Sequence, residues 1–460
     1  MASAAVPPSP SSSKRSRSRD STRSGTNSSF NTPAMTPFIT PSVSTHSLVI
    51  PSSTPGTPAN GASFVQDGTP YPAFLRLSIG DVNQRWNALE MAQFERLRDG
   101  AQAQASGADQ PYEYARCNTE EHAPRNRYAN VDPYLANRVK LEVPEGHSDY
   151  INASPIVLTT TQTKSALQYI ATQGPKSDSW SHIWRMIWKE NQNPAVVVML
   201  TQTHETGREK CFPYYPQTPS SPDMRINEHD EFQDGFIHTL HLASLRQDEE
   251  ARTQVREIDM TTDDGSDSRK IWHLLFAGWP DFSVPEGADR AALLKLVDIS
   301  REKNGDNTTN PRIVHCSAGI GRSGTFIALD WLMQELEEGA LDSMTDNHDP
   351  ILTVIEQLRD QRYGMVQSKQ QFLFIYDAVR ERWRERWIAN NPADAAKLGI
   401  TPAPKDTEPA LKRQKSMHGD GYGTLQPTTY VSDAAASNDA RAALEAELMD
   451  ADLSYEKGKT

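Results

Sequence analysis

Residues 313–326 read IVHCSAGIGRSGTF. An apolar run typical of a strand leads into a loop with glycines at 319, 321 and 324, and a run typical of a helix follows. Glycine lets such a loop curl until successive backbone N–H groups point to one centre and form an anion site. The following helix brings its positive end to the same point. The segment therefore predicts a site for a tetrahedral dianion.

Cys316 lies at the base of this loop, and Arg322 follows six residues later. The planar guanidinium group of an arginine suits two oxygens of a phosphate. An ordinary thiol is only a few per cent ionised at neutral pH, but loop N–H groups, a helix N-terminus and an arginine each favour the thiolate. We therefore expect Cys316 to ionise readily and to attack phosphorus in line, which gives a cysteinyl-phosphate.

The neighbours of these two residues are expected to assist. Ser323 is expected to donate to the sulfur and to stabilise it as a leaving group in a second step. His315 is expected to orient the loop through hydrogen bonds rather than to act as a base. The anion site is expected to be lined by the remaining loop residues, Ser317, Ala318, Gly319, Ile320 and Gly321. The alternative is a buried Cys in a Gly-rich turn, but this combination arises by chance with odds of about one in ten thousand or less.

The segment HCSAGIGRSGTF resembles the signature loop of the classical, non-receptor protein tyrosine phosphatases, in which five residues separate a Cys from an Arg. The resemblance runs from about residue 74 to residue 387, and YPAFLRLS (71–78) is similar to the fungal branch of this family. Strands and helices are mixed without a strict βαβ rhythm, which indicates one α+β domain. The resemblance implies a central twisted mixed β-sheet flanked by helices.

The sequence GWPDFSVP (278–285) resembles the mobile acid loop of the family. Expelling a phenolate from phosphotyrosine needs a proton donor, and the next step needs a base that activates water. The resemblance gives both roles to Asp281, makes Trp279 a hinge and places Phe282 in the pocket lining. Relatives usually carry Gly after this Phe, whereas this chain has Ser283, a change that bears on loop closure but leaves the donor in place.

The stretch RNRYANVDPYLANRVKL (125–141) resembles the loop that recognises phosphotyrosine. Tyr128 is expected to stack on the substrate ring and to deepen the pocket, so that phosphoserine is too short to reach the nucleophile. Asn130 stands where many relatives carry Asp to hold the substrate backbone, and Val131 is expected to line the same site. Taken alone, Tyr128 would be an ordinary half-buried tyrosine.

Two further stretches resemble motifs that flank the site. In HETGREKCFPYYP (204–216), Glu205 is expected to pair with the signature arginine, and Lys210 to contact the acid loop. In RYGMVQSKQQF (362–372), Gln367 is expected to orient the hydrolytic water with the help of Gln371. The alternatives are plain surface charges in the first stretch and a Gln-rich turn at a helix start in the second.

Composition divides the 460 residues into three parts. Residues 1–70 are rich in Ser, Thr and Pro, and residues 393–460 are mostly polar, so we expect two disordered tails around a phosphatase domain at 71–392. Seven Ser-Pro or Thr-Pro steps in the first tail belong either to a Pro-rich spacer or to sites for proline-directed kinases.

Charge and cysteine content exclude several classes of protein. The net charge is -13, and residues 1–70 carry five basic and two acidic side chains, so the remainder is -13 - 3 = -16. Such a body is a poor generic binder of nucleic acid or of an anionic membrane. No apolar run approaches the roughly 20 residues that cross a bilayer, and the start does not resemble a signal peptide. Three cysteines are too few for a disulfide scaffold. We therefore expect a cytoplasmic location. The basic run KRSRSR (14–19) makes nuclear import an alternative.

Hydrophobic periodicity predicts several elements of the domain. A helix over 81–98 is expected to begin with Asp81 as its N-cap and to end before a loop at 99–110. Further helices are expected at 326–339, 349–362 and 370–387, and strands at 195–200, 269–279 and 311–316.

These patterns together predict a monomeric protein-tyrosine phosphatase that acts on phosphotyrosine-containing proteins without a metal or another cofactor. One alternative is a binding module that captures phosphotyrosine without turnover, but such modules typically lack the Cys, the Arg or the acid. The other is a dual-specificity phosphatase, which Tyr128 and its loop oppose. Several similar fungal enzymes act on mitogen-activated protein kinases, so the resemblance implies such a kinase as substrate and a role in signal transduction.

Overall fold

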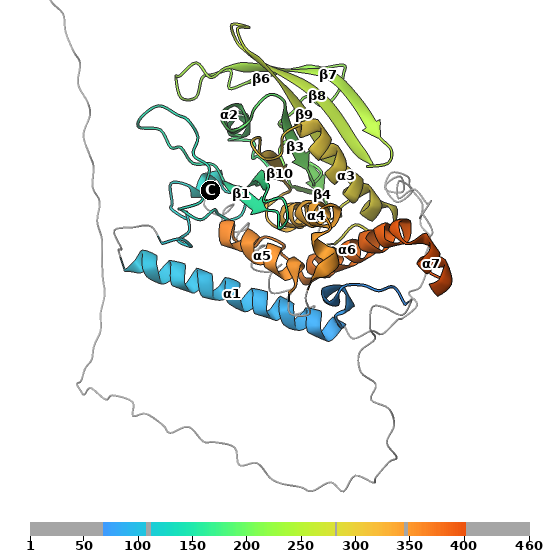
Figure 1. Cartoon of the computed structure of the whole chain (residues 1–460). Helices are drawn as coiled ribbons and strands as arrows, with labels where there is room; N and C mark the ends of the chain where they lie inside the picture. The colour runs from blue at the N-terminus through green and yellow to red at the C-terminus, as the bar shows by residue number, and fades with distance from the viewer. Residues whose placement is uncertain (1–67, 107–111, 281–282, 345–347, 402–460) are drawn as a thin grey trace, which may run out of the picture. The chain divides into compact units, whose positions relative to one another are not determined.

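An eight-stranded mixed β-sheet forms the centre of the fold (Figure 1). The computed structural model describes residues 68–106, 112–280, 283–344 and 348–401, which belong to one unit, Asn60–Thr460. The strands lie in the order β1-β2-β10-β3-β9-β8-β7-β6. Their bounds are β1 Ala153–Thr159, β2 Ala166–Thr172, β3 Ala195–Met199, β6 Asp223–Ile226, β7 His238–Asp248, β8 Thr253–Thr262, β9 Ser268–Phe276 and β10 Arg312–His315, while β4 His204–Glu205 and β5 Arg208–Glu209 form a separate hairpin.

The middle of the sheet is parallel and buried on both faces. Strand β10 runs parallel to β2 and β3, and His315 pairs with Thr172 on one side and Met199 on the other. Every residue of β3 and β10 is buried, as is typical of parallel strands that are covered on both faces. The three parallel strands end at the same edge of the sheet. The Cys316 loop leaves β10 at this edge, between the ends of β2 and β3.

Two hydrophobic cores cover the two faces of the sheet. Val196 and Val198 of β3 belong to one core, whereas Val197 and Met199 belong to the other, because successive side chains of a strand point to opposite faces. The helices are α1 Ile79–Ala105, α2 Ser181–Glu190, α3 Ala288–Asn304, α4 Gly321–Glu337, α5 Pro350–Gln361, α6 Lys369–Asn390 and α7 Pro392–Leu398, with 3-10 turns η1 Ala73–Arg76, η2 Ala123–Arg125 and η3 Ala340–Ser343.

Helix α4 lies at the centre of the first core. It packs against β2 and β10 and against α3, α5 and α6 (Figure 1), and nearly all of its residues are buried. Helix α2 covers the opposite face through Ile183, Trp184 and Ile187. Helix α4, which begins at the end of the Cys316 loop, is therefore packed between the sheet and three helices, which fixes the position of its first turn.

The first long helix differs from the prediction at both ends. Its N-cap is Ser78, whose hydroxyl accepts the Asp81 N–H at 3.1 Å, while the Asp81 carboxylate accepts the Ser78 N–H. Asp81 is thus the third residue of a capping box rather than the cap. The predicted loop at 99–110 is wrong over residues 99–105, because α1 continues to Ala105 through Ala and Gln residues that favour helix, while residues 107–110 lie outside the described residues.

Other elements lie near their predicted positions, except that α4 begins at Gly321 rather than at 326, so Gly321 and Gly324 belong to the helix and not to the loop. The α+β fold class is confirmed. Asp349 caps α5 by accepting the N–H groups of Ile351 and Leu352, and Pro350 is the first helical residue. The described chain continues beyond the expected boundary at 392 through α7 to residue 401. Residues 1–67 and 402–460, which hold most of the two expected tails, lie outside the described residues. Among the described residues, no helix has both the length and the apolar composition that a membrane crossing requires.

Candidate active site

The loop after β10 has the inward-turned backbone that its glycines predict. The Gly319 N–H points at Cys316 and donates to Sγ at 3.2 Å. Gly319 has a φ of +72°, and a Cβ atom there would lie 2.1 Å from the Thr172 carbonyl oxygen. Only glycine fits this position without displacing β2. Helix α4 begins two residues later, so its first N–H groups face the same centre.

Cys316 and Arg322 form the base of the site. The two residues keep 3% and 6% of their surface exposed. The Arg322 guanidinium donates to both carboxylate oxygens of Glu205, at 2.7 and 3.1 Å. It also donates to the carbonyls of Leu200 and Trp279, at 3.1 and 3.3 Å. The predicted pairing with Glu205 is therefore formed, and it holds the guanidinium plane in one orientation.

Glu205 is itself held in place by its neighbours. Its Oε1 accepts the Thr201 hydroxyl at 2.8 Å and the Gln202 N–H at 3.1 Å. The carboxylate thus connects the end of β3 to the signature arginine. This arrangement disfavours the alternative that Glu205 is a plain surface charge.

His315 anchors the loop through both of its ring nitrogens. Nδ1 lies 3.1 Å from the Cys316 carbonyl, which only accepts, so Nδ1 carries the proton. Nε2 then accepts from the Tyr214 hydroxyl at 2.7 Å. Burial lowers the pKa of His315 to about 4, so the ring is neutral at physiological pH. A neutral ring with both nitrogens engaged fits the predicted role in orienting the loop.

The Tyr214 hydroxyl extends this network to a second histidine. It lies 3.1 Å from His273 Nε2, and because its own proton goes to His315, His273 is the donor in that contact. Burial lowers the pKa of His273 well below its usual value. Neither Tyr214 nor His273 was predicted as a site residue, because their spacing from Cys316 carries no local signal.

Tyr128 lies beside the loop at the predicted rim of the site. Its hydroxyl donates to Ser317 Oγ at 2.8 Å, because Ser317 uses its own proton on the Lys210 carbonyl at 3.0 Å. Val131 is buried, and its carbonyl accepts from Asn152 at 2.6 Å. Asn130 is half-buried, its carbonyl accepts from Arg116, and its side-chain Oδ1 has no partner among the described residues.

The two predicted water-orienting glutamines lie against the start of α4. The Gln371 side-chain oxygen accepts the Gln367 N–H at 3.0 Å. A Cβ atom at Gly321 would lie 3.0 Å from Gln367 Oε1 and from Gln371 Nε2. The structure therefore brings both amides to the first turn of the helix that carries Arg322.

The acid loop is described only at its ends. The Trp279 indole N–H donates to the Ser283 carbonyl at 2.9 Å, and the Trp279 carbonyl accepts from the signature arginine. Asp281 and Phe282 lie outside the described residues, so their roles stay predictions. Lys210 is nearly buried, at 7% exposure, and its predicted contact with the acid loop stays a prediction for the same reason.

Ser323 differs from its prediction. Its hydroxyl is buried and has no hydrogen-bond partner among the described residues. The expected donation to the Cys316 sulfur is therefore not formed, and the Gly319 N–H occupies that role.

Arg362 is a functional candidate that was not predicted from the sequence. Its guanidinium donates to the carbonyls of Gly319 and Ala318, at 2.9 and 3.3 Å. A loop that turns its N–H groups inward leaves carbonyls that need donors elsewhere. That need is readable from the sequence, but the donor lies more than 40 residues away along the chain.

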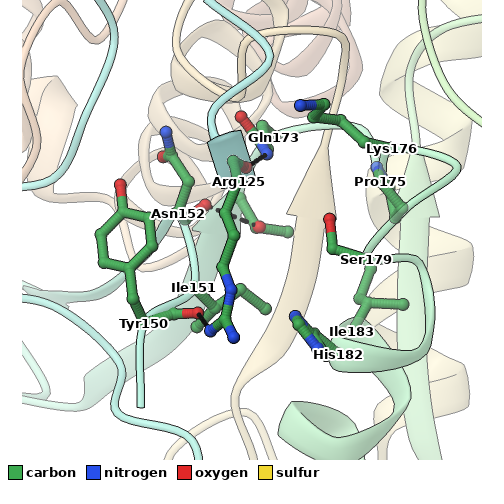
Figure 2. A pocket seen from close by; sticks show the side chains of 11 residues that line it. Arg125, Tyr150, Ile151, Asn152, Gln173, Pro175, Lys176, Ser179, His182 and Ile183 are labelled. Carbon is green, nitrogen blue, oxygen red and sulfur yellow. Dashed lines mark hydrogen bonds between the residues drawn. The ribbon is translucent and has the colours of Figure 1, made fainter. Parts of the chain in front are cut away.

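A small pocket lies behind the loop and is lined in part by Asn152 and Thr172 (Figure 2). Its volume of about 20 Å³ leaves room for one water molecule. Arg125 lines it and donates to the carbonyls of Ser148 and Tyr150, and neither Cys316 nor Arg322 is among the lining residues. In the part of the chain that the structure describes, no three His, Cys, Asp or Glu side chains are grouped as metal ligands.

Comparison with known proteins identifies the family. Residues 122–381 match the family model of the protein-tyrosine phosphatases. The chain belongs to the protein-tyrosine phosphatase family. The match contains all the predicted site residues, from Tyr128 to Gln371. Members of this family are phosphoric monoester hydrolases, and this assignment applies to the phosphatase described here.

Two curated relatives agree with this assignment. Tyrosine-protein phosphatase 1 of Saccharomyces cerevisiae is 36% identical over 277 residues, which are 56% of this chain and 81% of the yeast protein. Tyrosine-protein phosphatase Lar-like of Caenorhabditis elegans is 32% identical over 337 residues, which are 72% of this chain but only 13% of that protein.

Solved structures agree as well. The crystal structure of the catalytic domain of human protein tyrosine phosphatase non-receptor type 18 has a TM-score of 0.52 and 25% identity, and the match covers 66% of this phosphatase and 97% of that chain. A structure of PTPN18 in complex with HER2-pY1196 phosphopeptides gives the same TM-score at 26% identity and covers 93% of that chain. The predicted resemblance to classical non-receptor phosphatases, with a fungal relative among them, is confirmed.

Proposed function

We propose that this phosphatase hydrolyses phosphotyrosine in proteins through a cysteinyl-phosphate intermediate. In the first step the Cys316 thiolate attacks phosphorus, the bond from phosphorus to the phenolic oxygen breaks, and Asp281 gives its proton to the leaving tyrosine. In the second step water attacks phosphorus, Asp281 takes a proton back, and the sulfur leaves as the thiolate with release of inorganic phosphate.

One observation carries this proposal: a single loop directs a backbone N–H at the sulfur, and a carboxylate-locked guanidinium follows at the first turn of the next helix. Preorganised donors of this kind stabilise the charge on the transferring phosphoryl group without reorganisation. The Gln367 and Gln371 amides, at the same first turn, are close enough to the loop to position the hydrolytic water.

Three variants test the mechanism with p-nitrophenyl phosphate as substrate. Cys316→Ser is expected to abolish turnover. Asp281→Ala is expected to bind a phosphotyrosine peptide with wild-type affinity but to lower kcat by about 100-fold or more, since general acid catalysis contributes roughly 10²–10⁴-fold. Asp298→Ala, on the distant helix α3, serves as the matched control and is expected to keep wild-type kcat. Turnover by Cys316→Ser would exclude the covalent mechanism and favour another phosphatase chemistry.

Selectivity for phosphotyrosine is the second part of the proposal. Tyr128 is held at the loop by its hydrogen bond to Ser317, and the base of the site is nearly buried. A long substrate side chain is therefore required to reach the sulfur. The solved complex of a related phosphatase with phosphotyrosine peptides agrees with this substrate class. Equal kcat/KM for phosphoserine and phosphotyrosine peptides would instead support the dual-specificity alternative.

For the cellular substrate we propose a mitogen-activated protein kinase, in a cytoplasmic or nuclear signalling role and with a monomeric enzyme. The support is the similarity to fungal relatives and the Thr-Pro steps of residues 1–70, which such kinases would modify. Deletion of residues 1–70 is expected to lower the rate on an intact phosphorylated kinase while the rate on its phosphopeptide is unchanged. If the deletion leaves the rate on the intact kinase as unchanged as the rate on the phosphopeptide, this part of the proposal is wrong.

A further inference from the structure

Arg362 is a fully buried cation that contacts the catalytic loop from its carbonyl side. It follows α5 directly, and none of its surface is exposed. The guanidinium makes four hydrogen bonds, and all four acceptors are uncharged. They are the carbonyls of Gly319 and Ala318, at 2.9 and 3.3 Å, Asn152 Oδ1 at 2.7 Å and Ser154 Oγ at 3.1 Å.

Arg362 also differs from Arg322 and Arg359, two further buried arginines, in having no carboxylate partner. Arg322 pairs with Glu205, and Arg359 pairs with Glu90 at 2.9 Å. Within the described part of the chain, no ion pair includes Arg362. Burial lowers the pKa of Arg362 to about 10, so the group still carries its charge at neutral pH. A buried charge without a counter-ion lowers the stability of a fold by several kcal/mol. The fold therefore keeps this charge buried although its burial is destabilising.

One peptide unit connects this charge to the nucleophile. The carbonyl of the Ala318–Gly319 peptide accepts from Arg362, and the N–H of the same peptide donates to Cys316 Sγ at 3.2 Å. A hydrogen bond at the carbonyl of a peptide polarises its N–H, and cooperative strengthening of this kind is about 10–30% per bond. The guanidinium thus acts on the sulfur through an intervening amide.

We propose that Arg362 is a positioning residue that supplies a second buried positive charge to the anion site. Its counter-ion is the thiolate of Cys316 in the free enzyme and the phosphoryl group during turnover. Its fork holds the carbonyls of Ala318 and Gly319 so that the loop amides face the sulfur. This inference rests on the proposed cysteinyl-phosphate mechanism, in which a negative charge occupies the loop throughout.

The test compares Arg362→Met with Arg362→Lys, which keeps the charge but loses the planar fork. Iodoacetamide alkylation of Cys316 is followed by mass spectrometry as a function of pH, and inhibition by inorganic phosphate is measured with p-nitrophenyl phosphate. For Arg362→Met we expect the midpoint of the alkylation profile to rise by about one pH unit and phosphate inhibition to weaken about tenfold, since one unit corresponds to a tenfold change in the equilibrium. For Arg362→Lys we expect a shift of less than half of this and a kcat about tenfold below wild type.

Arg359→Met is the matched control. Arg359 is similarly buried and donates to the carbonyls of Met365, Val366 and Leu89, but not to the Cys316 loop. We expect this variant to lose stability to a similar degree and to keep the wild-type alkylation midpoint. All measurements are made below the melting temperature of each variant. If Arg362→Met does not fold, the kcat and the alkylation midpoint of Arg362→Lys test the role of Arg362 alone.

The outcomes separate this inference from the proposed function. Wild-type midpoint and wild-type phosphate inhibition in a folded Arg362→Met protein, or wild-type kcat in Arg362→Lys, would overturn the role of Arg362. Activity that survives complete alkylation of Cys316 in the wild-type enzyme would instead overturn the covalent mechanism. A shifted midpoint in both Arg362→Met and Arg359→Met would assign the effect to general loosening of the fold and would also overturn the inference.

Discussion

At the scale of single residues, the site depends on charged groups whose partners fix their orientation. Arg322 makes two parallel bonds to Glu205, whose side chain is only 8% exposed. A hydrogen bond to a charged group contributes about 1.5–3 kcal/mol, and loss of a buried acceptor removes most of it. The orientation of the guanidinium is therefore set by a residue outside the Cys316 loop.

We expect Glu205→Gln to lower kcat/KM for p-nitrophenyl phosphate by about 10- to 100-fold, which corresponds to the energy of one such bond. The amide keeps one acceptor for the guanidinium but presents a donor where the second acceptor stood. Steady-state kinetics at neutral pH measure this effect. Glu209→Gln is the control, because Glu209 pairs with Arg127 at 3.1 Å and is 38% exposed. Equal losses in the two variants would show that the Glu205 pair has no special role.

At the scale of elements, the turn from β10 into α4 decides where the chemistry can occur. Gly319 lies against the backbone of β2 and also needs a left-handed φ. A substitution there therefore combines two costs that can be separated. Gly305, at the end of α3, has nearly the same φ of +74°, but a Cβ atom there would meet nothing within 4 Å.

We expect Gly305→Ala to cost about 1–3 kcal/mol of stability, because its φ of 74° and ψ of -66° lie in a sparsely populated region of backbone conformation, with unchanged kcat. Gly319→Ala is expected to cost more and to lower kcat on the order of 100-fold, because the loop must move away from Thr172 and a shift of about 1 Å at a reacting centre has that effect. Thermal melting and steady-state kinetics give the two numbers. Identical kcat in both variants would mean that the loop tolerates the displacement.

The elements also show what a sequence can and cannot specify. The Cys316 loop was predictable because its chemistry is local to one contiguous stretch, whereas Glu205 and Gln367 were assigned roles through the resemblance of their stretches to the family. The N-cap of α1 was predicted at Asp81 instead of Ser78, because either residue alone satisfies a cap and only the reciprocal bonds distinguish them. Tyr214 and Arg362 were missed, because their roles arise from contacts between strands and helices far apart in the chain.

At the scale of the whole molecule, buried neutral histidines link stability to pH. His238 is 4% exposed, and neither ring nitrogen has a hydrogen-bond partner among the described residues. Burial lowers the pKa of His238 to about 4, and the nearby charges of Arg185 and Arg269 act in the same direction. The ring packs instead against Trp188 and Phe236, with centroid distances of 4.4 and 4.3 Å.

Because the folded state disfavours the protonated ring, the unfolded chain binds a proton first as the pH falls. The contribution of His238 to stability is fully present above the unfolded pKa of about 6.5 and is lost as the pH falls toward about 4. Between pH 7 and pH 5 this loss amounts to about 2 kcal/mol. We expect His238→Phe, which suits the aromatic surroundings and carries no proton, to lose about 2 kcal/mol less than the wild type over this interval in urea unfolding. His241→Phe, at an exposed position that pairs with Asp223, is the control and should keep the wild-type slope. If His238→Phe also keeps that slope, the acid sensitivity of the domain arises elsewhere, and His315 and His273 beneath the catalytic loop become the groups that set it.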